Sequence, residues 1–143
     1  MDWSYIAGFF DGEGNLHINK ILNKDKKIKA YQIAVRFYNS DIVVLSTIKE
    51  FLGYGVIYSN KRESKPDGVY ELSITSKKDV KNTLLHLEKH SISKKAKIIY
   101  LLTNFNFERN NNSGFDLETF HKMTERKNAH KFYVERSFLE KTA

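Results

Sequence analysis

The chain of 143 residues has no cysteine, a single proline and seven glycines. Without cysteine, disulfide bridges, thiolate zinc sites and cysteine nucleophiles are excluded. The scarcity of glycine and proline also excludes collagen-like and low-complexity chains. The longest apolar runs, such as residues 98–102, are too short to span a membrane. Residues 1–4 lack the basic and apolar regions of a secretory signal. We therefore expect no membrane association.

Basic residues outnumber acidic ones by 24 to 17, which gives a net charge of +7 with neutral histidines. The excess is concentrated in residues 54–97, where ten basic side chains face five acidic ones. Nineteen of the basic residues are lysines, which attract phosphates without the fixed geometry of arginine. A polyanion partner is one interpretation of this charge. A solvated basic surface without such a partner is the other.

Hydrophobic periodicity predicts an apolar, buried helix over residues 3–11, ended by the glycines at 12 and 14. Alternation predicts two hairpins with strands over residues 15–19, 31–37, 56–62 and 69–75. A period near 3.6 predicts helices that begin at Ser40 or Asp41, at Ser76 or Asp79, and after Ser93. Antiparallel strands with helices to one side make a single α+β domain. Its core spans about residues 3–105, and a helical extension is expected over about 114–143.

Residues 6–14 read Ile-Ala-Gly-Phe-Phe-Asp-Gly-Glu-Gly and place the carboxylate of Glu13 between two glycines, just before a strand. Hard divalent cations such as Mg²⁺ prefer oxygen ligands of this kind. Gly8 and Gly12 share one helical face, beside Ala7, so a second helix can approach closely. If that helix belonged to a second copy, a two-fold axis would bring two Glu13 carboxylates together. A core helix followed by a glycine turn, with Glu13 solvated, is the simpler interpretation.

This nonapeptide resembles, position for position, the LAGLIDADG signature of the homing endonucleases, and the element order over residues 3–105 is similar to that family's. The resemblance implies the LAGLIDADG homing-endonuclease fold, in which a motif helix precedes two hairpins that form a curved antiparallel four-stranded sheet with helices packed on one face. A single motif implies a homodimer that cuts double-stranded DNA at a long pseudo-palindromic site and leaves short 3′ overhangs. The dimer contact would include Tyr5 and four motif residues, Ala7, Gly8, Asp11 and Gly12.

The resemblance also implies which residues act. Glu13 and the carbonyl of Gly12 correspond to the family's metal ligands, with Mg²⁺ or Mn²⁺ supporting cleavage and Ca²⁺ binding without it. The other acid of the motif, Asp11, would be structural. Asn39, after the second strand, corresponds to a residue that positions water, or else it is an ordinary polar strand end or cap. A lysine is common before the third major helix, where Lys95 is the better candidate and Lys94 the next.

A two-stranded ribbon fits the major groove of DNA, where each base pair presents a distinct pattern of donors and acceptors. The polar strand faces are therefore expected to read bases through Asn15, His17, Asn19, Gln32, Arg36, Tyr38, Tyr58, Asn60, Arg62, Glu71 and Ser73. Lysines in the hairpin turns suit phosphate contacts, namely Lys24, Lys26, Lys27, Lys61 and Lys65. In the simpler interpretation, these are all solvent-facing residues. His86 and His90 lack a third ligand nearby and are expected at the surface.

The sequence thus predicts a Mg²⁺-dependent, site-specific DNA endonuclease, typically encoded in an intron. It would act wherever its target DNA resides, in an archaeal or bacterial cytoplasm or in an organelle. One alternative is a family member that has lost cleavage and serves as an RNA maturase on intron RNA or as a DNA-binding regulator. Another is a basic domain whose glycine-bearing helix serves only self-association.

Overall fold

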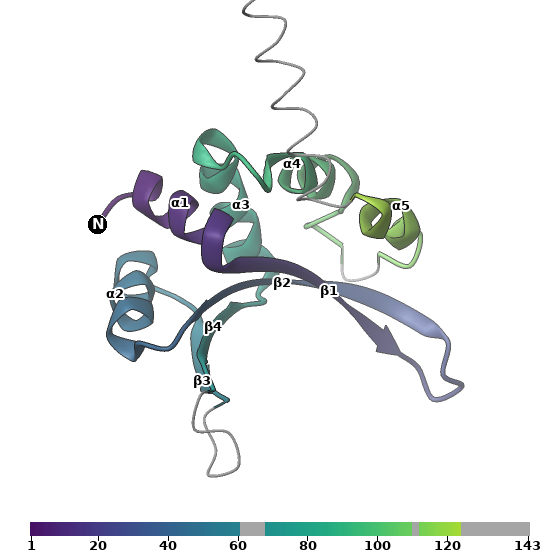
Figure 1. Cartoon of the computed structure of the whole chain (residues 1–143). Coiled ribbons are helices and arrows are strands. Elements are labelled where there is room, and N and C mark those ends of the chain that lie inside the picture. The colour runs from purple at the N-terminus through teal and green to yellow at the C-terminus, as the bar shows by residue number, and fades with distance from the viewer. Residues whose placement is uncertain (61–67, 110–111, 124–143) are drawn as a thin grey trace, which may run out of the picture.

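A computed structural model of the chain describes residues 1–60, 68–109 and 112–123. Helices and strands follow one another in the order α1 (Trp3–Glu13), β1 (Gly14–Leu22), β2 (Ile28–Asn39), α2 (Ile42–Leu52), β3 (Val56–Ser59), β4 (Tyr70–Ile74), α3 (Lys77–His90), α4 (Lys95–Asn104) and α5 (Leu117–Lys122) (Figure 1). The fold is α+β, with two hairpins between helices, as the sequence predicts.

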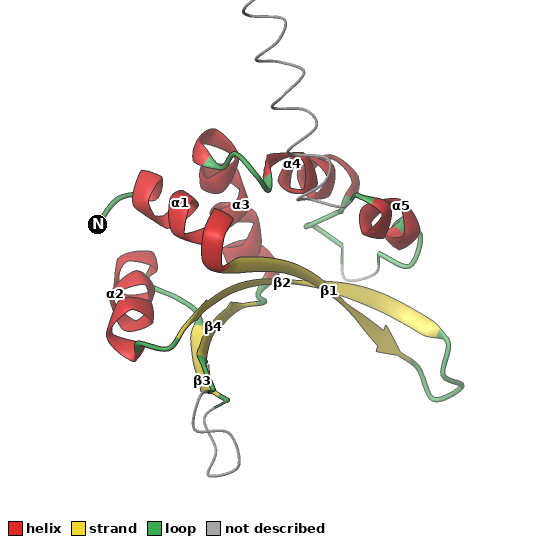
Figure 2. Ribbon diagram, viewed as in Figure 1, coloured by secondary structure: helices red, strands yellow, loops and turns green. Residues whose placement is uncertain are grey.

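The four strands form one antiparallel sheet in the order β1-β2-β4-β3, so β2 joins the two hairpins. The sheet is arched, and α1, α3, α4 and α5 lie on its convex side (Figure 2). Its concave face carries none of the described helices. The end of β2 is level with the start of β4, since Asn39 pairs with Tyr70. The two hairpin turns therefore lie at opposite ends of the sheet.

One hydrophobic core lies between the convex face and the helices. The strands contribute alternate residues, which are Leu16, Ile18, Tyr31, Ile33, Val35, Phe37, Leu72 and Ile74. The helices contribute residues at three- and four-residue spacing, among them Ile6, Phe10, Leu45, Ile48, Val80, Leu84, Leu87, Ile98 and Leu101. Phe10 of α1 packs on Phe37 of β2 with ring centroids 5.2 Å apart. This contact fixes α1 directly above the strand that joins the two hairpins.

Several elements differ from their predicted bounds. α1 continues through Glu13, and β1 and β2 form a ladder that reaches the pair Leu22 and Ile28. Side chains on both faces are exposed near this end of the hairpin, so alternating hydrophobicity gave no signal there. β3 spans Val56–Ser59, and residues 61 and 62 of the predicted strand lie outside the described residues. Lys94, rather than Ser93, occupies the N-cap position of α4.

The two histidines of α3 differ in exposure. His90 is exposed, as predicted. His86 is only partly exposed, because its ring stacks on Trp3 with centroids 4.3 Å apart and an interplanar angle of 4°. His86 thus lies at the surface only in part, and its ring helps to attach the start of α1 to α3.

The predicted helical extension over residues 114–143 is only partly within the described chain. α5 lies in it, and residues 124–143 lie outside the described residues. In the ranges that the structure does describe, no helix has the length and apolar character needed to cross a membrane.

Candidate functional site

Helix α1 presents two different faces. Ala7 and Phe10 have no exposed surface and lie in the core. On the opposite face Tyr5 is 50% exposed, and a Cβ atom added at Gly8 or Gly12 would meet no atom within 4 Å. Glycine within a helix costs about 1 kcal/mol relative to alanine, and nothing in the described chain requires it at these positions. The prediction of Ala7 as a dimer contact is corrected, because its side chain is covered by its own chain.

Gly14 has the opposite surroundings. It directly follows α1, and its N–H donates to the carbonyl of Phe10. A Cβ atom here would lie 2.2 Å from Phe10 Cδ1 and 2.6 Å from Phe10 O. The Phe10 side chain is fully buried and its carbonyl belongs to the helix, so neither can move aside easily. Glycine at this position lets the chain pass from helix to strand without a linker.

Asp11, the first acid of the motif, is bound within the chain. Its carboxylate accepts hydrogen bonds from the Ser91 hydroxyl and, at 2.8 Å, from the backbone N–H of Ile92. Ser91 is 2% exposed, so this hydroxyl depends on Asp11 for a partner. These bonds attach the C-terminal end of α1 to the connection between α3 and α4. Sequence patterns did not single out Ser91, because its partner lies 80 residues away.

Lys94 reaches the same end of α1. Its Nζ donates to the carbonyl of Asp11 at 2.8 Å and lies 5.5 Å from the centre of the Phe10 ring. The start of α4 is an unfavourable place for a cation, but the side chain extends to the C-terminal end of α1, where the helix dipole favours one. Lys95 is exposed at the first turn of α4. The structure therefore brings Lys94, and not Lys95, into contact with the motif, and which of the two lysines acts in catalysis stays a prediction.

Glu13 and Gly12 are both exposed, at the end of α1 where the next strand begins. The carbonyl groups at this helix end carry partial negative charge and favour cations. A carboxylate and a carbonyl oxygen are ligands that Mg²⁺ accepts, so the residues fit a magnesium ion. Within the described ranges, no three Asp, Glu or His side chains gather as a metal site. One chain therefore offers part of a coordination shell, and water, substrate or a second chain would complete it.

Asn39 lies at the same end of the sheet as Glu13, because Gly14 pairs with Phe37 and β2 ends two residues later. Its Oδ1 accepts the backbone N–H of Asp41 at 2.8 Å, which forms an Asx turn before α2. The interpretation of Asn39 as an ordinary polar strand end thus accounts for this oxygen, since the N-cap of α2 is Asp41. A role in positioning water stays a prediction and would fall to the Nδ2 group.

An arginine–glutamate pair lies on the concave face. Arg36 pairs in register with Ser73 of β4, and its Nε lies 3.8 Å from Glu71 Oε1. That nitrogen is buried and makes no hydrogen bond, which typically costs about 1–3 kcal/mol. Tyr38 lies directly opposite Glu71. Its pKa is raised by partial burial and by the negative charge of Glu71, against the opposing effect of Arg36. The three side chains form one interacting group.

The predicted base-reading residues differ in exposure. Four are exposed, Asn15, His17, Tyr58 and Asn60, and five are partly buried, Asn19, Gln32, Arg36, Tyr38 and Glu71. Ser73 is only 7% exposed, since its short side chain lies between Arg36 and Val56 of the neighbouring strands. The prediction that Ser73 reads bases is therefore wrong. Val56, which pairs with Ser73, is 51% exposed on this face.

The turn between β1 and β2 carries three of the predicted phosphate-binding lysines, all exposed, which are Lys24, Lys26 and Lys27. Asn23 orders this turn by accepting hydrogen bonds from the backbone N–H groups of Asp25 and Lys27. The other predicted basic contacts, Lys61, Arg62 and Lys65, lie outside the described residues.

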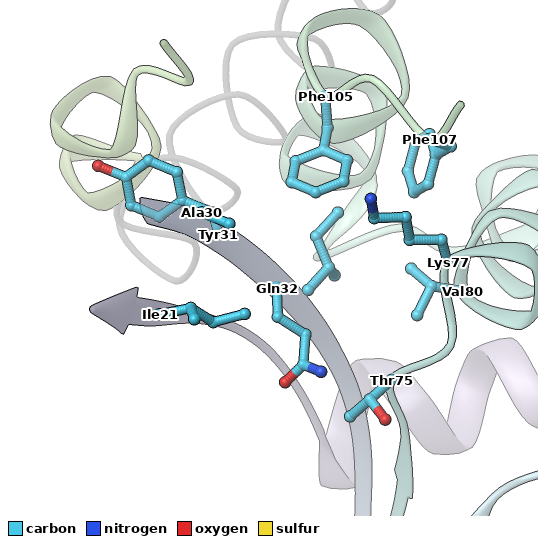
Figure 3. A pocket seen from close by; sticks show the side chains of 10 residues that line it. Ile21, Ala30, Tyr31, Gln32, Thr75, Lys77, Val80, Phe105 and Phe107 are labelled. Atoms are coloured by element: carbon cyan, nitrogen blue, oxygen red, sulfur yellow. The ribbon is translucent and has the colours of Figure 1, made fainter. Parts of the chain in front are cut away.

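A small, mostly apolar cavity of about 100 Å³ lies away from the motif (Figure 3). It is lined by residues of the first hairpin, of α3 and of the segment after α4, including Ile21, Tyr31, Val80, Phe105 and Phe107. None of the predicted catalytic or metal-binding residues lines it. The candidate site is therefore the exposed region around Glu13 and the concave face.

Solved structures share this architecture. Homing endonuclease I-TnaI superposes with a TM-score of 0.59 and 26% identity, over 70% of this chain and 68% of that one. I-CvuI, in complex with its target, superposes with a TM-score of 0.59 and 23% identity, over 71% of this chain and 63% of that one. I-GzeII, in complex with a DNA target, superposes with a TM-score of 0.61 and 22% identity, over 76% of this chain and 37% of that one. The chain thus spans less than two thirds of I-CvuI and of I-GzeII. Its fold is that of the homing endonucleases.

The sequence comparison is more specific. The model of the LAGLIDADG endonuclease family matches residues 6–106, from the motif helix to the end of α4. No curated protein sequence matches the chain. The chain therefore belongs to the LAGLIDADG endonuclease family.

Proposed function

We propose that the protein is a site-specific DNA endonuclease that acts as a homodimer and uses Mg²⁺ or Mn²⁺. The observation that carries the proposal is the position of Glu13, whose exposed carboxylate lies where the open glycine face of α1 meets the first strand of the concave face. A metal ligand, a surface for a second copy and a surface for DNA thus adjoin one another. The DNA complexes of I-CvuI and I-GzeII support DNA as the substrate.

The open face of α1 supports a second copy of the chain as the partner. Gly8 and Gly12 leave the helix backbone accessible, and Tyr5 supplies exposed apolar surface beside them. Close packing against an identical helix would offset the helical cost of two glycines. A two-fold axis through this face would bring the two Glu13 carboxylates together, so each chain would complete the site of the other.

Glu13 and the carbonyl of Gly12 would hold the metal ion, which supplies an activated water and stabilises charge on the phosphate when bound. Lys94 is only 8% exposed and donates to the carbonyl of Asp11, two residues before Glu13, so it adds positive charge beneath the site without itself lying at the surface. Its ammonium would favour a phosphate close to the carboxylate. The net charge, twice +7 in a dimer, would attract the DNA backbone. We expect Ca²⁺ to bind without supporting cleavage.

The test is a cleavage selection on a randomised palindromic DNA library with Mg²⁺. We expect cut products with short 3′ overhangs. Glu13→Gln keeps the shape of the side chain but removes its charge, so cleavage should fall about a thousandfold. DNA binding measured without metal should stay nearly unchanged. Glu118→Gln is the matched control, since it removes the same charge from an exposed site on α5 and should leave cleavage intact.

The other outcomes separate the alternatives. Sequence-specific DNA binding without any cut product would contradict the endonuclease and favour a DNA-binding regulator. Binding of intron RNA alone would favour a maturase. A dimer that binds no nucleic acid would leave only self-association.

A further inference from the structure

We propose that Arg36 and Glu71 together read one G·C base pair in each half of the DNA target, with guanine facing Arg36 and cytosine facing Glu71. This inference rests on the proposed function. The two residues lie on the neighbouring strands β2 and β4, with Arg36 Nε and Glu71 Oε1 3.8 Å apart. Their side chains are 24% and 17% exposed, so both are held in the floor of the concave face and still accessible from it.

The two side chains match the edge of a G·C pair. In the major groove guanine presents two acceptors, O6 and N7, and cytosine presents the donor N4–H. The guanidinium of Arg36 can donate to both acceptors at once, while the carboxylate of Glu71 accepts from cytosine. An A·T pair would turn the donor N6–H toward Arg36 and the acceptor O4 toward Glu71. A reversed C·G pair would also oppose like groups, so the orientation is read as well. A T·A pair would offer O4 to Arg36 and N6–H to Glu71, but it gives the guanidinium one acceptor in place of two and is therefore bound less well than G·C.

The surroundings of Arg36 favour base reading over phosphate contact. Its Nε is buried and lies beside Glu71, with Ser73 and Tyr38 on the adjoining positions of the two strands. A guanidinium held in this way loses little conformational freedom on binding, which favours directional contacts. Glu71 by itself would repel the phosphates of DNA. A base contact made jointly with Arg36 gives this carboxylate a function on a surface that faces DNA.

The register also places this base pair within the half-site. Asn15 pairs with Arg36, next to the end of α1, whereas the hydrogen-bonded pair Asn19 and Gln32 lies four residues further along β1. Four residues of a strand span about 13 Å, which corresponds to about four base pairs. The G·C pair should therefore lie nearer the centre of the site than the bases that face Asn19 and Gln32. Substitutions of Gln32 supply an internal control.

The experiment is a binding selection on randomised palindromic half-sites with Ca²⁺, followed by sequencing. The wild-type protein should prefer G·C at one position by about tenfold or more over A·T and C·G, and by a smaller factor over T·A. The double variant Arg36→Gln, Glu71→Gln replaces the guanine-reading group with an amide that pairs with adenine, and replaces the carboxylate with an amide that can donate to thymine O4. The preferred base at that position should therefore change from guanine to adenine. Gln32→Ala should instead alter a position about four base pairs further from the centre and leave the G·C preference intact.

Two results would overturn the inference and leave the proposed function standing. One is the selection of identical sequences by wild type and the double variant. The other is an Arg36→Ala variant that weakens binding equally on all sequences and lowers its salt dependence, as loss of a phosphate contact would. If the wild-type protein selected no sequence at all, both proposals would fail. Misfolding is recognised by thermal unfolding of each variant, and it cannot change guanine preference into adenine preference.

Discussion

On helix α1, Asp11 and Glu13 are only two residues apart, yet their surroundings differ. Asp11 accepts two hydrogen bonds from the connection between α3 and α4, whereas Glu13 is exposed at the helix end. The neighbouring glycines show the same contrast, with Gly14 tightly packed and Gly12 open. Since a helix turns about 100° per residue, residues two apart point in nearly opposite directions. One short motif can therefore stabilise its own chain on one face and present a site on the other.

The largest effect on stability should come from adding a side chain at the tightly packed glycine. Gly14→Ala would place a methyl group against the buried Phe10 ring and its carbonyl. We expect a loss of about 3 kcal/mol in the free energy of unfolding, measured by chemical denaturation. Gly12→Ala is the matched control on the open side and should not destabilise the single chain. Equal losses for the two variants would remove the distinction between the two glycines.

Substitution of the two acids should show the same contrast, with the larger loss of stability at Asp11. Asp11→Ala leaves the buried hydroxyl of Ser91 and the N–H of Ile92 without their acceptor. The expected loss is about 2 kcal/mol in the free energy of unfolding. Glu13→Ala, at an exposed site, should change stability by less than about 0.5 kcal/mol. A larger loss for Glu13 than for Asp11 would contradict the roles assigned to them.

Substitutions on the open face should weaken self-association without destabilising the separate chain. Gly8→Ala and Gly12→Ala should each raise the stability of the separate chain by up to about 1 kcal/mol, because alanine is the better helix former. In the proposed dimer the added methyl groups would meet the partner helix. We expect at least about tenfold weaker self-association by sedimentation analysis. Unchanged self-association would place the dimer contact elsewhere.

The smallest effect concerns an acid far from the motif. The pKa of Asp116 is lowered because the hydroxyl and backbone N–H of Thr119 donate to its carboxylate, which caps α5. Because the pKa lies below its ordinary value of 3.8, the ionised carboxylate stabilises the folded chain above pH 3.8. This stabilisation is lost as the pH falls through the lowered pKa. Carboxyl NMR should report that lowered pKa. Thr119→Ala should return the pKa of Asp116 toward 3.8. It should not change the effects on stability that are expected for the substitutions in α1.

Much of the fold was predictable because burial on one face leaves a periodic pattern. Leu16 and Ile18 on β1, or Val80, Leu84 and Leu87 on α3, show it clearly. The choice between Lys94 and Lys95 was not predictable, because adjacent lysines have the same chemistry. The contact that distinguishes them joins residues 83 apart. The burial of Ser73 likewise depends on its cross-strand neighbours, which no local pattern of β4 contains.

Strand β2 has a further consequence for the kinetics of folding. It pairs with β1 across a short turn, but its pairing with β4 joins Val35 to Ile74, residues 39 apart. Closing the longer loop costs more chain entropy, so we expect the first hairpin to form early and β4 to dock on it later. Arg36 and Glu71 belong to the two strands that this late step joins. The surface proposed to read DNA would therefore be completed only near the end of folding.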